Sequence, residues 1–276
     1  MRRRDFLLTA GAGLAGFGTY AHWLEPFWIE VSRLDLAIPQ LPHSLDGRSL
    51  LHLSDLHIGP VRNSYLERVW RTGTALAPDI VMYTGDWVTL KHIRQIDKLE
   101  AHLPQVPRGR MLTLSVLGNH DYGVRWRDMA MANAVMDRLG AADIRVLRNE
   151  AMDVDGLFVA GIEDYWSPFA RPEQALASWR RGTPSLVLNH NPDGMDDRAR
   201  WNGYDGWVLS GHTHGGQCRS PFLPPPLLPV RNRRYTSGEV AVGDGRRVYI
   251  SRGVGFNVQV RVNVRPEMTL FTLRRA

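Results

Sequence analysis

Cysteine and lysine are the scarcest chemically informative residues in this chain of 276 amino acids. Cys218 is the single cysteine, so no intramolecular disulfide forms and the fold does not depend on an oxidising compartment for its stability. Lys91 and Lys98 are the only lysines among 34 basic residues, so the formal charge of +6 comes from arginine. No basic run of the kind that follows a nucleic-acid backbone is present, and we expect no nucleic-acid partner.

Internal repeats and long biased segments are also absent. With 43% hydrophobic and 22% charged residues, the composition is that of an ordinary globular protein, which excludes a disordered, collagenous or coiled-coil chain. The length suits one large domain with a substantial core.

The first 24 residues differ from the rest. Arginines at positions 2–4 precede an uncharged stretch at positions 6–23. This is the layout of an export signal, and the arginine pair resembles the twin-arginine signal. Cleavage near residues 19–21 and retention as a membrane anchor both remain open. In either case the positive-inside rule predicts that the main domain lies outside the cytoplasm, in the cell envelope.

After a linker and first strand region at residues 25–47, apolar strand-like runs alternate with helix-like segments. We expect strands at 49–54, 79–84 and 111–117, and helices at 64–76, 93–102 and 126–139. This alternation indicates βαβ units and a layered α/β fold. The main domain is expected to span residues 48–276.

The second half is richer in short strands. We expect a meander within 145–161, a helix at 172–180, and strands at 185–188, 206–209, 239–242, 247–251 and 268–273. Residues 221–230, with the sequence PFLPPPLLPV, contain too many prolines for a helix or a central strand.

Residue types that bind metals follow five of the predicted strands, at the sheet edge where α/β proteins place their active sites. The five blocks are Asp55-Leu56-His57, Gly85-Asp86, Gly118-Asn119-His120-Asp121, Asn189-His190 and Gly211-His212-Thr213-His214. A single Asp-x-His occurs often by chance, but five blocks in order argue against coincidence. His52, inside an apolar strand, is interpreted as a core or supporting residue.

In their order and their residues, the five blocks resemble the motifs of the calcineurin-like metallophosphoesterase superfamily, and especially those of its bacterial branch of membrane-associated or exported phosphodiesterases. The resemblance implies a four-layer αββα sandwich, in which helices flank two mixed β-sheets. It also implies two divalent metal ions, one held by Asp55, His57 and His214 and the other by Asn119, His190 and His212. Asp86 would bridge them. Mixed carboxylate, amide and imidazole ligands suit Mn, Fe, Zn or Ni.

Such a pair of metals would hydrolyse a phosphate ester through a metal-bridging hydroxide, without a nucleophilic residue. His120 is the expected proton donor to the leaving group, and Asp121 is expected to orient it. Cys218 is interpreted as a small buried residue on the strand that follows His214.

The nature of the substrate remains open. A lipid or cell-envelope phosphodiester is favoured, because the apolar segment 221–230 adjoins Arg231, Arg233 and Arg234. Residues 219–276 contain 11 arginines and three acidic residues, so the excess positive charge follows the last motif. Hydrolysis of UDP-2,3-diacylglucosamine is an alternative, which an outward-facing domain argues against. A non-catalytic scaffold of the same fold is another, which the complete ligand set argues against.

Overall fold

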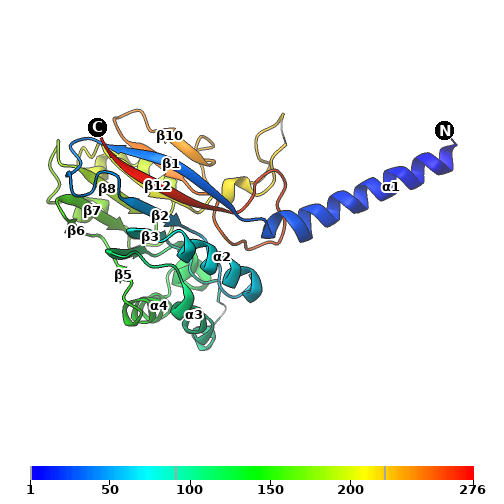
Figure 1. The fold of residues 1–276 in the computed structure, drawn as a ribbon, viewed down its shortest axis with the longest axis horizontal. Coiled ribbons are helices and arrows are strands. Elements are labelled where there is room, and N and C mark those ends of the chain that lie inside the picture. The colour runs from blue at the N-terminus through cyan, green and yellow to red at the C-terminus, as the bar shows by residue number, and fades with distance from the viewer. Residues whose placement is uncertain (1, 91, 221) are drawn as a thin grey trace.

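The structure is a computed structural model that describes residues 2–90, 92–220 and 222–276 (Figure 1). Pro221, the first residue of the apolar segment, lies outside the described residues. The strands are β1 (Glu30–Ile38), β2 (Ser49–Leu53), β3 (Ile80–Thr84), β4 (Leu112–Val116), β5 (Arg145–Val146), β6 (Glu150–Val154), β7 (Leu157–Ile162), β8 (Ser185–Asn189), β9 (Trp207–Ser210), β10 (Gly238–Ala241), β11 (Arg247–Ile250) and β12 (Glu267–Arg275). The α-helices are α1 (Arg3–Thr19), α2 (Asn63–Ala75), α3 (Asp97–His102), α4 (Met129–Ala141) and α5 (Pro172–Ala175).

The strands form two six-stranded mixed sheets, with the orders β1-β12-β2-β3-β4-β5 and β10-β11-β9-β8-β7-β6. In the first sheet β2, β3, β4 and β5 run parallel, and in the second β7, β8, β9 and β11 do. Parallel strands end at the same edge, so the segments that follow β2, β3 and β4 meet there, as do those that follow β8 and β9.

Successive side chains along each strand point to opposite faces of the sheet, so each sheet packs against a different core on each face. Leu50 and Met82 belong to the core between the two sheets, whereas Leu51 and Val81 belong to the core beneath α2, α3 and α4. Those helices cover the outer face of the first sheet (Figure 1). On the second sheet Val187 and Val208 pack into a third core with α5 and nearby turns. The predicted αββα sandwich is therefore confirmed.

The helices over the first sheet form for local reasons. In α2 the buried residues Tyr65, Leu66, Val69 and Trp70 recur at helical spacing, which gives the helix one apolar face. In α4 the side chain of Asp128 caps the helix by accepting hydrogen bonds from the backbone of Ala130 and Met131.

Three sequence expectations are wrong in detail. The segment 145–147 is no part of a meander: β5 extends the first sheet, where Leu147 N donates to Ser115 O at 2.8 Å. Asn149, at a left-handed φ of 53°, then turns the chain toward the second sheet. The helix expected at 172–180 is the short α5, and the one expected at 93–102 is divided into a 3-10 turn and α3.

The N-terminal helix α1 extends away from the body, as Figure 1 shows. Within the part of the chain that the structure describes, no helix has the length and apolarity needed to cross a membrane. The residues after α1 pack back on the body: Arg261 N donates to Ala21 O at 2.9 Å, and Val264 N donates to the buried Glu25 carboxylate at 2.6 Å. Strand β1 then pairs in parallel with β12 along its whole length.

Candidate metal centre and active site

The predicted ligands follow the ends of β2, β3, β8 and β9 and the turn after β4, and many have an unusual backbone. Five of the seven lie in the left-handed region, with φ of 56° at Asp55, 48° at His57, 54° at Asp86, 70° at His212 and 50° at His214. A non-glycine residue there costs about 1–3 kcal/mol and persists only where its surroundings impose it. The fold therefore holds these side chains in place at a cost in stability, as is typical of functional sites.

Two glycines of the motifs allow the strand ends to approach one another closely. A Cβ atom at Gly211 would lie 1.9 Å from Ser54 Oγ, and one at Gly85 would lie 2.2 Å from Gly118 N. Gly85 also has a φ of +90°. Side chains at these two positions would push apart the segments that carry Asp55, Asp86 and Asn119.

Asp55, His57 and His214 place their ligand atoms together on one side of the site. His57 Nε2 lies 3.1 Å from His214 Nε2, and His214 Nε2 lies 3.3 Å from Asp55 Oδ1. Asp86 Oδ2 is 3.8 Å from His57 Nε2. These separations are those of donors that surround one cation.

Asn119, His190 and His212 form a second group, joined to the first by the same Asp86. His190 Nε2 lies 3.3 Å from Asp86 Oδ2, and His212 Nδ1 lies 3.0 Å from Asn119 Oδ1. His212 Nδ1 and His190 Nε2 are 3.3 Å apart. The structure thus brings all seven predicted ligand residues together, with Asp86 Oδ2 between two groups of donors.

Three of the histidines are oriented by a hydrogen bond from their other ring nitrogen. His190 Nδ1 donates to Thr84 O at 2.6 Å, and His212 Nε2 donates to Pro229 O at 2.8 Å. His57 Nδ1 bonds Thr89 Oγ1 at 2.7 Å, and that hydroxyl donates to Asn257. These bonds direct the opposite nitrogens of His190, His212 and His57 into the site as ligands.

The electrostatics of the site fit divalent cations. Burial lowers the pKa of His57, His212 and His214 to about 3, so these rings are neutral. Burial also opposes protonation of His190, but the Asp86 carboxylate raises its pKa to about 10, so a metal that binds its Nε2 would displace a proton. Asp55 and Asp86 are buried carboxylates. Two carboxylates, an amide oxygen and four imidazoles facing one another form a donor set for two metals.

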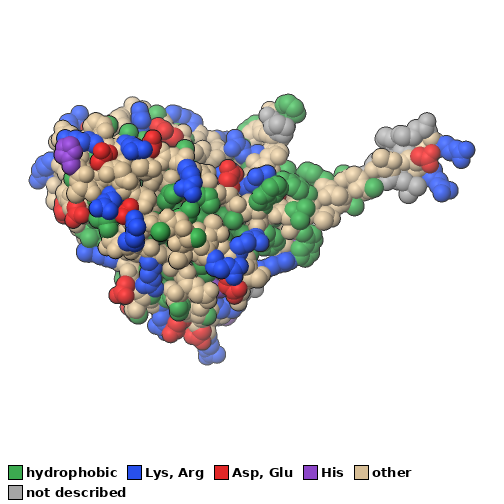
Figure 2. All heavy atoms as spheres, viewed as in Figure 1, with side chains coloured by type: hydrophobic (Ala, Val, Ile, Leu, Met, Phe, Trp, Pro, Cys, Tyr) green, Lys and Arg blue, Asp and Glu red, His purple; other side chains and the backbone are tan. Residues whose placement is uncertain are grey.

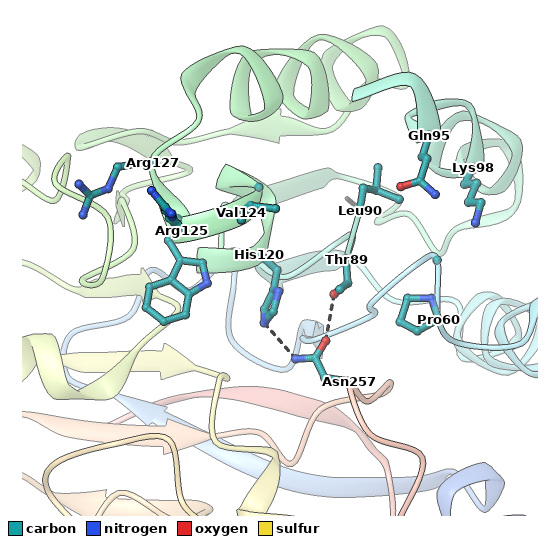
Figure 3. Close-up of a pocket in the computed structure, with 13 residues that line it drawn as sticks. Pro60, Thr89, Leu90, Gln95, Lys98, His120, Val124, Arg125, Arg127 and Asn257 are labelled. Atoms are coloured by element: carbon teal, nitrogen blue, oxygen red, sulfur yellow. Dashed lines mark hydrogen bonds between the residues drawn. The ribbon is translucent and has the colours of Figure 1, made fainter. Parts of the chain in front are cut away.

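His120 lies beside this set and is only partly buried. Its backbone N donates to Asp86 Oδ1 at 2.8 Å, which fixes the start of the side chain. Its ring Nε2 accepts a hydrogen bond from Asn257 Nδ2 at 2.9 Å, and Asn257 Oδ1 accepts one from Thr89 Oγ1 at 3.1 Å (Figure 3). Neither Asn257 nor Thr89 belongs to one of the five sequence blocks that predicted the site. The turn formed by residues 251–255 precedes Asn257 in the chain but is not one of the five metal-binding blocks.

Asp121 does not orient His120, contrary to expectation. Its two carboxylate oxygens accept hydrogen bonds from Gly118 N at 2.9 Å and Val88 N at 3.1 Å. Burial raises the pKa of Asp121 to about 8. Asp121 therefore stabilises the loop that contains Asn119 and His120, through hydrogen bonds to the backbone of Gly118 and Val88.

The expectation for Cys218 is also wrong. The residue is half-buried and forms an isolated β-bridge with Val262, so it belongs to no strand. Its side chain lines the same cavity as the metal ligands.

Three of the arginines after residue 218 have a structural role. Arg246 and Arg261 are buried; Arg246 pairs with Asp244, and Arg261 donates to the backbone carbonyls of Arg252, Gly253 and Gly255. Arg252 bonds the Glu267 carboxylate at 3.1 Å. The charge of these arginines therefore stabilises the fold, and fewer of them face solvent than the sequence indicates.

A cavity of about 330 Å³ is lined by four of the predicted metal ligands. Its polar end contains Asp86, Asn119, His120, His212 and His214. Its other end is lined by Pro226, Leu227, Pro229, Val258 and Val260. The cavity thus joins the ligand cluster to an apolar wall that includes part of the proline-rich segment.

Comparison with known proteins agrees with this geometry. Residues 48–216 match the family model described as calcineurin-like phosphoesterase. The chain is 33% identical to phosphodiesterase YaeI of Escherichia coli, over 98% of each chain. It is 30% identical to the metallophosphoesterase YkuE of Bacillus subtilis, over 99% of this chain and 98% of that one. It is 25% identical to the UDP-2,3-diacylglucosamine pyrophosphatase LpxG of Chlamydia trachomatis, over 91% of each chain. The chain therefore belongs to the calcineurin-like phosphoesterase family, in its bacterial phosphodiesterase branch, and is a hydrolase of phosphoric esters.

Proposed function

We propose that this chain is a phosphodiesterase of the cell envelope that cleaves a phosphodiester carrying an apolar chain, with two divalent metals as cofactors. The carrying observation is that four predicted ligands, Asp86, Asn119, His212 and His214, line the same cavity as a group of apolar side chains. The order of positive charge and uncharged residues at the N-terminus supports the envelope location.

Asp55, His57, Asp86 and His214 would hold one metal, and Asp86, Asn119, His190 and His212 the other. When bound, the two metals would polarise the phosphate oxygens as Lewis acids and lower the pKa of the attacking water. His120 would donate a proton to the leaving oxygen. Its backbone N bonds Asp86, which places the residue next to the predicted ligands, while its ring bonds Asn257, which is not one of them.

The apolar part of the substrate would lie along Leu227, Val258 and Val260, which form the wall of the cavity next to the ligands. A chain of methylene groups placed there gains about 0.8 kcal/mol for each group buried. The name of the relative LpxG specifies a diacylated substrate for that protein, which is in line with this proposal.

Exposed apolar side chains gather at the same end of the molecule and favour contact with a membrane. Phe222 and Leu223, at the tip of the proline-rich loop, are 89% and 69% exposed. Trp23 and Trp28, where α1 joins the body, are each 51% exposed, and Arg62 and Arg265 stack on them. Figure 2 shows hydrophobic side chains at both places, with arginines among them. Aromatic and basic residues together suit an anionic lipid surface.

The function is tested with the full chain, purified in detergent and loaded with Mn²⁺. Aryl phosphodiester, aryl phosphomonoester, UDP-2,3-diacylglucosamine and phospholipid are compared side by side. We expect the diesters to be cleaved, and His120→Ala to lower kcat about 10²–10⁴-fold without loss of metal. Preferred cleavage of UDP-2,3-diacylglucosamine would favour the alternative that the LpxG relatives suggest. No cleavage of any of these esters would contradict the proposal.

The membrane contact is tested separately. Phe222→Ser with Leu223→Ser should weaken binding to vesicles that contain phosphatidylglycerol, while hydrolysis of a soluble aryl diester stays unchanged, because neither residue lines the cavity. Ile93→Ser is the matched control, since Ile93 is also exposed, at 44%, but lies next to α3. Unchanged binding of the double variant would refute a contact through this loop.

A further inference from the structure

A second and larger cavity, of about 910 Å³, shares His120 and Asn257 with the first, and Figure 3 shows both residues among its lining. In Figure 3 Gln95 and Lys98 line one flank, Arg125 and Arg127 line the opposite flank, and His120, Thr89 and Asn257 lie between them. No predicted metal ligand lines this cavity.

The charge of the second cavity has one sign. Among the described residues, those with a charge that line it are Lys98, Arg125 and Arg127, and none is an aspartate or glutamate. Among residues 2–90, 92–220 and 222–276, none of these three cations forms an ion pair. Three exposed, unpaired cations around one hollow attract an anion.

The loop that carries two of these cations is held in place by the fold. Arg125 and Trp126 have left-handed φ values of 68° and 59°. Trp126 N donates to Gly123 O at 3.1 Å, and the Trp126 ring packs on Trp166 with centroids 4.5 Å apart. Trp166 in turn contacts the ring of His212 edge-on, at 4.4 Å between centroids. The loop that carries Arg125 and Arg127 is therefore linked to the predicted ligand His212 by packing of aromatic rings.

His120 and Asn257 line both cavities, and they form the boundary between them. The phosphate must lie in the first cavity, where the metal ligands are. In an in-line displacement the leaving oxygen departs on the side opposite the attacking water. The group that His120 protonates is therefore directed past His120 into the second cavity.

On the basis of the function proposed above, we propose that the second cavity is the leaving-group subsite and that it selects a leaving alcohol bearing an anionic group, such as a carboxylate or a further phosphate. In the reaction the oxygen of water forms a new P–O bond as the P–O bond to the alcohol breaks. The leaving oxygen takes a proton from His120, and a proton of the attacking water returns to the imidazole through solvent. The products are the anionic alcohol and a phosphate monoester that keeps the apolar chain.

Two chromogenic diesters test this. Methyl para-nitrophenyl phosphate has a neutral leaving group, and its analogue with a carboxylate ortho to the nitro group has an anionic one. With the Mn²⁺-loaded full chain at low salt we expect kcat/KM to be roughly tenfold higher for the carboxylated ester, because three exposed cations face its leaving group. The preference should decline as salt is added.

The triple variant Lys98→Ala, Arg125→Ala and Arg127→Ala should bring the ratio of the two kcat/KM values close to one. Arg94→Ala is the matched control: Arg94 precedes Gln95 but lines a different cavity, so its loss should leave the ratio as it is. As a second readout, the carboxylated nitrophenol should inhibit cleavage of the neutral ester in the wild type more strongly than para-nitrophenol does.

The possible failures are distinguishable. If both esters are cleaved at the same rate, or if the preference survives in the triple variant, the cationic subsite is refuted and the phosphodiesterase stands. If Arg94→Ala lowers the ratio as much as the triple variant does, the preference reflects overall charge and the subsite is also refuted. If neither ester is cleaved, the proposed function itself fails.

Discussion

The side-chain amide of Asn257 forms hydrogen bonds to both His120 and Thr89, and Thr89 in turn bonds the predicted metal ligand His57. Its Nδ2 donates to His120 Nε2 at 2.9 Å, and its Oδ1 accepts from Thr89 Oγ1, which lies 2.7 Å from His57 Nδ1. One amide thus fixes the position of the expected proton donor relative to the first group of ligands. Because His120 and Asn257 are far apart in the sequence, this relationship depends on the fold.

Replacing Asn257 with alanine should impair catalysis through loss of positioning. We expect Asn257→Ala to lower kcat for an aryl diester about 10–100-fold, the range seen when a supporting hydrogen bond is removed, while bound metal stays the same. Steady-state kinetics and metal analysis measure both quantities. Asn263→Ala is the control, since Asn263 donates to the carbonyl of Arg219 at the surface and does not line the cavity. An unchanged kcat would mean that His120 is positioned by other contacts.

Metal binding should stabilise the fold measurably. At a free Mn²⁺ concentration about 1,000 times its dissociation constant, a ligand that binds only the native state adds about 4 kcal/mol. We therefore expect a chelator to lower Tm and Mn²⁺ to restore it. Asp86→Asn should abolish most of that shift, because Asp86 lies within 4 Å of ligand nitrogens in both groups. A full Mn²⁺ shift in Asp86→Asn would argue against a bridging role.

His52 provides a pH-dependent prediction outside the ligand set. The residue is fully buried, its Nε2 lies 2.8 Å from Thr84 Oγ1, and burial lowers its pKa to about 4. The folded state therefore binds fewer protons here than the unfolded state, whose histidine has a pKa near 6.5. This residue thus makes stability fall as pH drops from about 6.5 toward 4.

In His52→Gln that loss should be absent. Between about pH 7.5 and 5 the wild type should lose roughly 2 kcal/mol more unfolding free energy than the variant does. Urea unfolding in the presence of a chelator measures the difference. His43→Gln, at an exposed histidine, should follow the wild type. Parallel pH profiles for the wild type and His52→Gln would show that His52 is not kept neutral by the fold.

Much of the site was predictable, because motif residues that follow parallel strands must meet at one sheet edge. Asp55, Asp86 and Asn119 follow β2, β3 and β4 in the first sheet, so their proximity is a consequence of the topology. The left-handed backbone at Asp55 and His214 was not predictable, because no local signal requires it at an aspartate or a histidine. It is imposed by tertiary packing.

Other features were hidden for a different reason. Arg261 reads as surface charge in the sequence, yet it is buried and burial lowers its pKa to about 10. Asn257 has no motif, and Lys98 and Arg125 are separated in the chain by the whole of β4. Their convergence on one cavity depends on how α3 and the loop after His120 are placed on the sheet. Composition and spacing carry no information about such placement.

The segment after α1 allows a last prediction. Ala21 O accepts from Arg261 N and His22 O from Gln259 Nε2, both at 2.9 Å, while the Glu25 carboxylate accepts from Val264 N. Removal of residues 1–18 should leave Tm unchanged, whereas removal of 1–29 should lower it by roughly 5–10 °C, because buried donors lose their partners. Glu25→Gln in the full chain isolates the carboxylate and should have a smaller effect. Equal Tm values for the two truncations would show that residues 19–29 are dispensable, and would favour cleavage near Ala21 over retention of the helix.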